Sequence, residues 1–242
     1  MKLIPHDRKE VFQFKQFSVR HAKSTMKVGT DGVLLGAWVK NEGEKRVLDV
    51  GTGSGVIALM LAQRFSEASI LAIDIDRDSA DEASENFMKS PWAQRLAARH
   101  ISLQQLARGK EFFDLIVSNP PYFNNGTRSP HTARHRARHR LALDHAELVG
   151  LSSRLLEPEG KLVVIIPELS YKEFLAHIRE NGLREQKVLH FRPKSSKAVE
   201  RIIIQAGRGE VTLAENELIQ YDDMGNWSAH YKALTRDYYL RL

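Results

Sequence analysis

The middle of the chain, from residue 46 to residue 207, alternates short apolar runs with segments of helical periodicity. The runs at residues 46–50 and 113–117 have the length of a strand and are almost continuously apolar. Strands of this kind are buried on both faces, and their alternation with helices favours a mostly parallel sheet covered by helices on both sides. The pattern therefore predicts an α/β fold in which ligands bind at the carboxyl ends of the strands.

The alternation of apolar runs and helical periodicity also gives boundaries for the expected strands and helices. Strands are expected at residues 46–50, 69–73, 95–100, 113–117, 161–166, 187–191 and 201–205, which makes a seven-stranded sheet. Helices are expected after residue 56 and at residues 79–88, 145–156 and 171–181. Asp76 is expected to cap the second of these helices, and Pro158 with Gly160 to stop the third. Because no repeat or linker divides the chain, we expect one domain, with a core at residues 46–207 and decorations at 1–45 and 208–242.

General composition excludes several classes of protein. None of the 242 residues is cysteine, which rules out disulfides, thiolate metal sites and cysteine nucleophiles. No apolar run approaches the ~18 residues of a membrane span, and the first residues lack the apolar core of a secretory signal. We therefore expect a cytoplasmic protein that needs no membrane.

A glycine-rich turn joins the first expected strand to the first helix. Gly51, Gly53 and Gly55 follow Asp49 at the strand end, and Asp74 ends the next strand. Glycines allow a tight turn and close approach of a ligand to the free N–H groups of a helix N-terminus. The spacing differs from the dinucleotide fingerprint. Asp74 suits ribose hydroxyls and Asp49 a cationic amine, so the site fits an adenine nucleoside with a zwitterionic tail. A purely structural turn is the alternative.

The most specific motif is Asn119-Pro120-Pro121-Tyr122, directly after the fourth expected strand. An exocyclic amine on a planar base is a poor nucleophile because its lone pair is delocalised. The side-chain carbonyl of Asn119 and the backbone carbonyl of Pro120 can accept its two N–H hydrogens and direct the lone pair at a methyl donor. Tyr122 offers an aromatic face on which a base can stack. The alternative is a turn that merely ends a strand.

Both motifs, within residues 47–167, resemble those of class I S-adenosylmethionine-dependent methyltransferases, which have a Rossmann-like fold. The resemblance implies S-adenosylmethionine as the cofactor and catalytic roles for Asn119, Pro120 and Tyr122. It also implies a set of cofactor-binding residues: Asp49, Gly51, Thr52, Gly53, Gly55, Asp74, Ile75 and Asn119. The Asn-Pro-Pro-Tyr motif by itself fits methylation of adenine N6, protein glutamine or guanine N2.

Segments outside these motifs indicate which family of methyltransferases the chain resembles. Residues 14–17, 27–38, 90–93, 143–145 and 236–239 are similar to bacterial tRNA(Val) adenine-N6 methyltransferases, which modify the adenine 3′ of the anticodon. This similarity covers essentially the whole chain and implies that Thr30 and Asp31 close over the cofactor. The family usually offers an acidic residue to the cofactor's adenine after the third strand. Here that position holds Ser102.

A basic segment follows the Asn-Pro-Pro-Tyr motif and Phe123. It accounts for five of the net six positive charges and contains no acid: Arg128, Arg134, Arg136, Arg138 and Arg140. A helix that was only a solvated surface would normally mix in acids, so the segment is expected to bind the phosphates of a tRNA anticodon arm, with Tyr122 and Phe123 at the base. The histidines at positions 131, 135 and 139 lack interleaved carboxylates, so no metal site is expected.

Rival functions differ in their substrates. A release-factor glutamine methyltransferase would normally carry a separate helical amino-terminal domain, whereas about 45 residues precede the first strand here. Three further rivals are a guanine-N2 ribosomal RNA methyltransferase, a DNA adenine methyltransferase and a non-catalytic RNA-binding module. A monomer is expected rather than an obligate oligomer.

Overall fold

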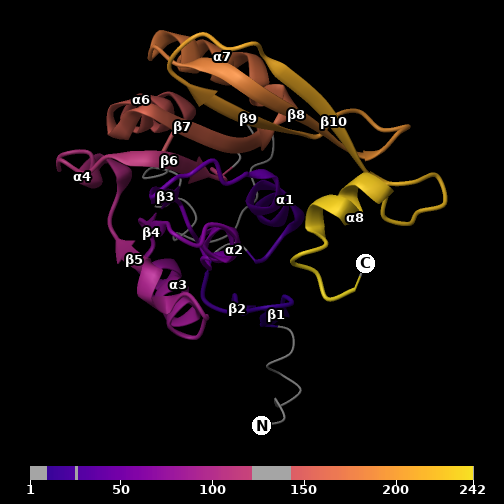
Figure 1. Cartoon of the computed structure of the whole chain (residues 1–242), viewed down its shortest axis with the longest axis horizontal. Helices are drawn as coiled ribbons and strands as arrows, with labels where there is room; N and C mark the ends of the chain where they lie inside the picture. Colours follow the sequence, from indigo (N-terminus) through magenta and orange to yellow (C-terminus); the bar gives the residue numbers. More distant parts are fainter. Residues whose placement is uncertain (1–9, 25–26, 122–142, 242) are drawn as a thin grey trace, which may run out of the picture.

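The computed structural model describes residues 10–24, 27–121 and 143–241. Its centre is an eight-stranded sheet with the strand order β10-β8-β9-β7-β6-β3-β4-β5 (Figure 1). The strands are β3 (Arg46–Val50), β4 (Ser69–Asp74), β5 (Leu96–His100), β6 (Phe113–Ser118), β7 (Leu156–Pro167), β8 (Arg184–Lys194), β9 (Arg201–Gly207) and β10 (Ala214–Tyr221). Only β9 runs antiparallel to its neighbours, β7 and β8. The expected mostly parallel, Rossmann-like sheet is confirmed.

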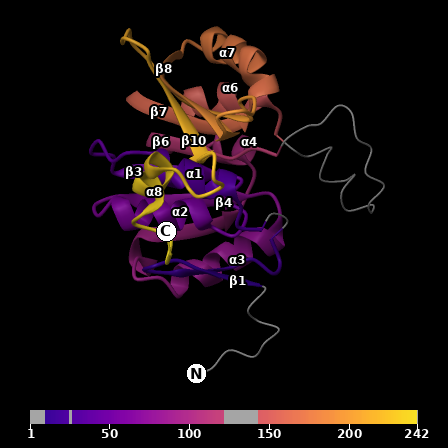
Figure 2. The same cartoon turned by 90° about the vertical axis from the view of Figure 1, so that its right-hand side faces the viewer.

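Helices cover both faces of this sheet, and each face has its own core (Figures 1 and 2). One core includes residues of α1 (Thr30–Trp38), α2 (Val56–Arg64), α3 (Arg77–Met88) and α8 (Ala229–Thr235). The other includes residues of α4 (Leu103–Leu106), α6 (His145–Leu155) and α7 (Tyr171–Glu180). Successive strand residues alternate between the two cores, as Val47 and Leu48 do, because side chains of a strand point alternately to its two faces. Among the described residues, no helix is long and apolar enough to cross a membrane.

Two expectations from the sequence were wrong in detail. The sheet has eight strands rather than seven, because β10 pairs in parallel with β8 at the edge. Half of β10 is exposed, so it lacks the apolar run that marks the buried strands. The strand expected at residues 161–166 begins earlier: α6 ends at Leu155, close to the expected end, and Pro158 and Gly160 lie in the irregular start of β7. Gly160 fits there because an added Cβ would lie 2.8 Å from the carbonyl oxygen of Phe113.

The beginning and the end of the described chain pack together beside α2. The hairpin of β1 (Val11–Gln13) and β2 (Ser18–Arg20) leads into an aromatic cluster. Phe14 stacks on Phe17 at 4.5 Å and on Tyr239 at 6.3 Å between ring centroids. The Tyr238 hydroxyl donates to the carbonyl of Met60 in α2. The closing Arg-Asp-Tyr-Tyr motif therefore has a clear packing role in this fold.

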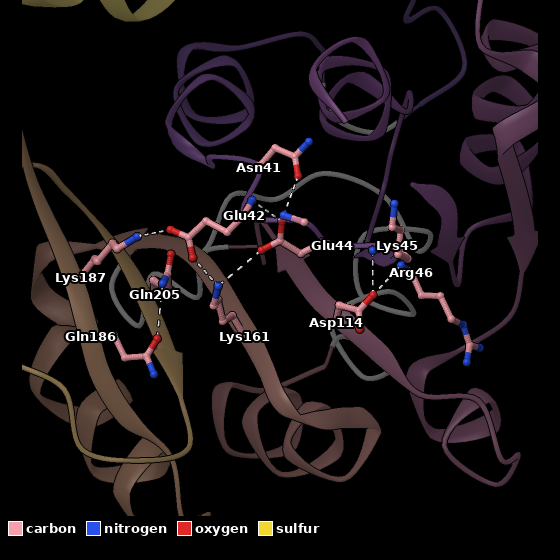
Figure 3. A network of polar contacts seen from close by, with 11 residues as sticks. Asn41, Glu42, Glu44, Lys45, Arg46, Asp114, Lys161, Gln186, Lys187 and Gln205 are labelled. Atoms are coloured by element: carbon pink, nitrogen blue, oxygen red, sulfur yellow. Dashed lines mark hydrogen bonds and ion pairs between the residues drawn. The ribbon is translucent and has the colours of Figure 1, made fainter. Parts of the chain in front are cut away.

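A polar network ties the loop before β3 to the far half of the sheet (Figure 3). Glu42 accepts hydrogen bonds from Lys161 in β7 and from Lys187 in β8, the latter at 2.6 Å. Both lysines lower the pKa of Glu42 to about 2, Lys161 more than Lys187. Asp114 in β6 accepts from the backbone N–H groups of Lys45 and Arg46, each at 2.8 Å. These contacts fix where β3 begins relative to its neighbours.

Candidate active site

Three central strands end in register at the carboxyl edge of the sheet. Val50 of β3 is aligned with Ile73 of β4 and with Ser118 of β6. The Ser118 hydroxyl also donates to the Val50 carbonyl at 2.9 Å. Neighbouring strands lie about 5 Å apart. The next residue of each strand therefore belongs to one short row along this edge: Gly51, Asp74 and Asn119. The row lies where the strand order reverses between β3 and β6, which is the ligand crevice of open α/β sheets.

The glycine turn combines open space with tight packing. Gly51 (φ +72°) and Gly53 (φ +55°) adopt the left-handed conformation, and an added Cβ on either would meet nothing within 4 Å. Gly55 (φ +83°) is different, because its added Cβ would lie 2.5 Å from the Phe87 ring of α3. Gly51 and Gly53 can therefore border a ligand. Gly55, expected from the sequence to line the cofactor, is buried against α3 and sets how closely that helix approaches the turn.

Asp74 holds the turn from the side. Its carboxylate accepts from the backbone N–H of Gly53 at 2.9 Å and from that of Asp76 at 2.8 Å. The Asp74 side chain is half-buried at the carboxyl edge of the sheet. The next residue, Ile75, is 40% exposed, which is unusual for a large apolar side chain at the end of a buried strand.

Asp49 lies beneath the turn and is 0% exposed. One carboxylate oxygen accepts from the Thr52 hydroxyl at 2.6 Å, and the other has no hydrogen-bond partner among the described residues. Burial, with a smaller contribution from the negative charge of Asp74, raises the pKa of Asp49 to about 7. The structure thus gives Asp49 a role in supporting the turn. Its contact with a cationic amine stays a prediction from the sequence.

Asn119 is half-buried and Pro120 is buried at the end of β6. Both residues lie beside Gly51, so the glycine turn and the Asn-Pro-Pro-Tyr motif start next to each other in space. The hydrogen bond between Ser118 and Val50, 68 residues apart in the chain, shows this proximity. Other predicted substrate-binding residues lie outside the described residues: Tyr122, Phe123, Arg128, Arg134, Arg136, Arg138 and Arg140.

The remaining predicted cofactor residues flank this row. Thr30 is exposed at the start of α1, and Asp31 forms an ion pair with Arg201 at 3.0 Å. Arg201 begins β9 opposite Pro167, the last residue of β7, so the pair lies at the same carboxyl edge. Ser102 caps α4, and its hydroxyl accepts from the Gln105 N–H at 3.2 Å. The serine hydroxyl keeps its own hydrogen for another acceptor.

Arg201 was missed in the sequence analysis. In the sequence Arg201 is only the polar first residue of an apolar strand. No local pattern predicts that it pairs with Asp31, 170 residues earlier in the chain. The pairing of Asp31 with Arg201 holds the first turn of α1 against the sheet. This contact supplies a physical reason for the acid at position 31 in addition to its predicted role at the cofactor.

Comparisons with known proteins agree with this geometry. The family described as methyltransferase small domain matches residues 21–186. A protein of Parabacteroides distasonis named tRNA1(Val) (adenine(37)-N6)-methyltransferase is 40% identical, over 96% of this chain and 98% of its own length. A protein of Dickeya chrysanthemi with the same name is 39% identical, over 96% of this chain and 94% of its own.

A solved structure shows the same fold. A predicted O-methyltransferase from Agrobacterium tumefaciens superimposes with a TM-score of 0.68 at 17% identity, covering 86% of this chain and 96% of that one. At this identity the likeness concerns the arrangement of strands and helices alone.

Proposed function

The chain belongs to the methyltransferase small domain family and to the family of its relatives named tRNA1(Val) (adenine(37)-N6)-methyltransferase. On this basis we propose that it methylates adenine N6 in tRNA(Val). The target is the adenine on the 3′ side of the anticodon, and the methyl donor is S-adenosylmethionine. The observation that carries the proposal is the row in which Asn119 lies beside the open glycine turn.

The residues at the carboxyl edge fit this cofactor. The open space at Gly51 and Gly53 admits a ligand against the backbone of the turn. Asp74 can accept from ribose hydroxyls while it holds the turn through Gly53, and the exposed side of Ile75 suits an adenine ring. S-adenosylmethionine supplies a methyl group already activated by its sulfonium. The protein therefore has to align the two reactants rather than form a covalent intermediate.

Asn119 and Pro120 act on the nitrogen that is methylated. The Asn119 side-chain carbonyl and the Pro120 backbone carbonyl accept the two hydrogens of the exocyclic amine. With both hydrogens held, the nitrogen becomes more tetrahedral, and its lone pair points toward the cofactor side of the row. The amine keeps one of these hydrogens after transfer and releases the other to solvent. Tyr122 stacks on the base in this proposal, which limits its rotation.

The basic segment binds the tRNA, with Phe123 and the five arginines at positions 128, 134, 136, 138 and 140 facing the anticodon arm. Guanidinium groups suit phosphates because they offer paired N–H donors. We propose further that the protein acts in the cytoplasm as a monomer and needs no metal.

The test is a methylation assay with labelled S-adenosylmethionine and separate pools of tRNA, ribosomal RNA, DNA and release factor. Products are digested to nucleosides or amino acids. The expected result is N6-methyladenosine from tRNA alone, lost when the adenine 3′ of the anticodon of tRNA(Val) is replaced. Label in guanine or glutamine would overturn the proposed substrate, and absence of label in every pool would overturn the activity.

A further inference from the structure

Helix α3 holds the chain on both sides of the glycine turn. Its residues Ala83 and Phe87 pack against Gly55. A Cβ added to Gly55 would lie 3.3 Å from the Ala83 side chain and 2.5 Å from the Phe87 ring. Two polar side chains of the same helix, Glu82 and Asn86, are 0% and 2% exposed. They lie four residues apart and therefore share one face of the helix. That face meets residues 20–24, which run from the last residue of β2 into the following loop (Figure 1) and which we call the anchored segment.

Glu82 acts as an acceptor for three consecutive backbone amides. One carboxylate oxygen accepts from Ala22 at 2.8 Å and from Lys23 at 3.0 Å, and the other accepts from Ser24 at 2.7 Å. Burial by itself would raise the pKa of Glu82, but the three backbone amides and the Ser24 hydroxyl together outweigh it and hold the pKa below its usual value. A buried carboxylate needs such donors, since an unsatisfied one would be strongly destabilising.

Asn86 joins the anchored segment directly to the glycine turn. Its amide oxygen accepts from the Arg20 N–H at 2.9 Å, and its amide nitrogen donates to the Arg20 carbonyl at 2.8 Å. The same nitrogen donates to the carbonyl of Ser54 at 2.8 Å. Ser54 lies between Gly53 and Gly55. One side chain therefore fixes both the anchored segment and the turn proposed to hold the cofactor.

The chain beyond the anchored segment packs on the first residues of α2, which follow the glycine turn. Val28 donates its N–H to Nδ1 of His21 at 2.8 Å. At the start of α1, an added Cβ on Gly32 would lie 3.3 Å from Val56, the first residue of α2 after the turn. The anchored segment is therefore linked to the glycine turn through Asn86, and Gly32 of α1 packs on the start of α2. Thr30 and Asp31 immediately precede Gly32 in the chain.

We propose that Glu82 and Asn86 are positioning residues for the cofactor site. They touch no reacting atom. They set the anchored segment, and through it the start of α1, against the turn at residues 51–55, so that this wall of the site is formed before the cofactor arrives. Preorganisation of this kind lowers the cost of binding. The inference rests on the proposed use of S-adenosylmethionine.

The test compares Glu82→Gln and Asn86→Asp with the wild type. Glu82→Gln places an NH2 group against a backbone N–H, and Asn86→Asp places a carboxylate oxygen against two carbonyls. Each should weaken S-adenosylmethionine binding, measured by calorimetry, about tenfold or more. KM for the cofactor should rise by a similar factor, whereas kcat at saturating cofactor should change little. Hydrogen exchange at the amides of residues 22–24 should accelerate before global unfolding does.

Glu85→Gln is the matched control. It removes the same charge from the same helix, but Glu85 bonds only the exposed Lys23 ammonium, at 2.9 Å. It should leave the dissociation constant unchanged. Glu82→Asp keeps the charge, so its dissociation constant for S-adenosylmethionine should lie between those of wild type and Glu82→Gln. If Glu82→Gln does not fold, Glu82→Asp takes its place in the test. Unchanged cofactor affinity in folded Glu82 and Asn86 variants would refute the positioning role, whereas a wild type that binds no S-adenosylmethionine would refute the proposed function instead.

Discussion

At the scale of single residues, the two aspartates of the glycine motif have different environments. Asp74 is half-buried at the edge and binds the turn through Gly53, whereas Asp49 is fully buried with the Thr52 hydroxyl on one oxygen. The sequence predicts ribose hydroxyls as partners of Asp74 and a cationic amine as the partner of Asp49. In the structure Asp49 also supports the turn from below, and burial makes its ionisation sensitive to pH near neutrality.

That sensitivity gives a prediction for the protein without cofactor. In the unfolded chain Asp49 ionises near 3.8, and in the folded protein its pKa is about 7. Between these values the unfolded state releases the proton and the folded state keeps it, so stability falls as pH rises from about 4 to about 7. Asp49→Asn removes this titration. In thermal melts from pH 5 to 8 the variant should gain stability relative to wild type as pH rises, and parallel profiles would contradict the buried ionisation.

A second prediction at this scale concerns Asn119. If its side chain holds the target amine, Asn119→Ala should lower the single-turnover rate on the order of 10²–10³, the usual loss for one preorganised hydrogen bond. S-adenosylmethionine affinity, measured by calorimetry, should change little because the glycine turn is intact. Near-normal turnover would remove Asn119 from the catalytic role. The neighbouring substitution Ser118→Ala controls for loosening of the end of β6.

At the scale of elements, the glycine turn is a compromise between ligand access and helix packing. Gly51 and Gly53 leave open space, and Gly55 lets α3 approach. Residues of α3 then reach the anchored segment through Glu82 and Asn86, and Asn86 also bonds Ser54 in the turn. A single helix therefore couples the turn to the amino-terminal part of the chain.

Gly55→Ala should be more destabilising than Gly51→Ala. Both need a left-handed conformation that costs an L-residue roughly 1–2 kcal/mol. Only the added methyl group at position 55 collides with the Phe87 ring. The further loss from overpacking is typically ~1–3 kcal/mol. Urea denaturation of the two variants measures the difference. Combining Gly55→Ala with Phe87→Leu should recover part of it, and equal losses at both positions would show that the ring moves aside freely.

The network at Glu42 predicts acid sensitivity at the other edge of the sheet. Lys161 and Lys187 lower the pKa of Glu42 to about 2, against 4.5 for the ordinary side chain. The stabilisation is complete above pH 4.5 and is lost as pH falls toward 2, because the folded state must then be protonated against both lysines. Glu42→Gln should therefore reduce stability at pH 6 more than at pH 3, as measured by denaturant unfolding. An equal effect at both values would mean that the ion pairs contribute nothing.

At the scale of the whole molecule, the sheet, the two cores and the packed ends of the described chain form a scaffold whose carboxyl edge carries the proposed site (Figures 1 and 2). The relatives that match almost the full length of the chain are named for a tRNA substrate. A folded RNA is large compared with the row of Gly51, Asp74 and Asn119. Affinity for it should come mainly from phosphate contacts made outside that row.

The arginine segment provides the corresponding prediction. Replacing Arg134 and Arg138 by glutamine should flatten the dependence of log K on log salt by one to two units, since each phosphate contact contributes about 0.7 on single strands and about 0.9 on duplex. The measurement is fluorescence anisotropy with an anticodon stem-loop across a salt series. S-adenosylmethionine affinity serves as the control and should stay constant. Identical slopes for variant and wild type would make the segment a solvated surface.

The sequence by itself determined the features that depend on neighbouring residues: the buried parallel strands, the glycine turn, the cap at Asp76 and the Asn-Pro-Pro-Tyr motif. Such features follow from local burial, turn geometry and side-chain chemistry. Tertiary structure alone decided strand register, which puts Gly51, Asp74 and Asn119 in one row. It also added β10 to the sheet edge, where half of the strand is exposed. It also decided that Glu82, in a helix rich in acids, faces inward. Acidic residues on a helix ordinarily face water, and only the approach of three backbone amides from residues 22–24 makes burial of this one stable.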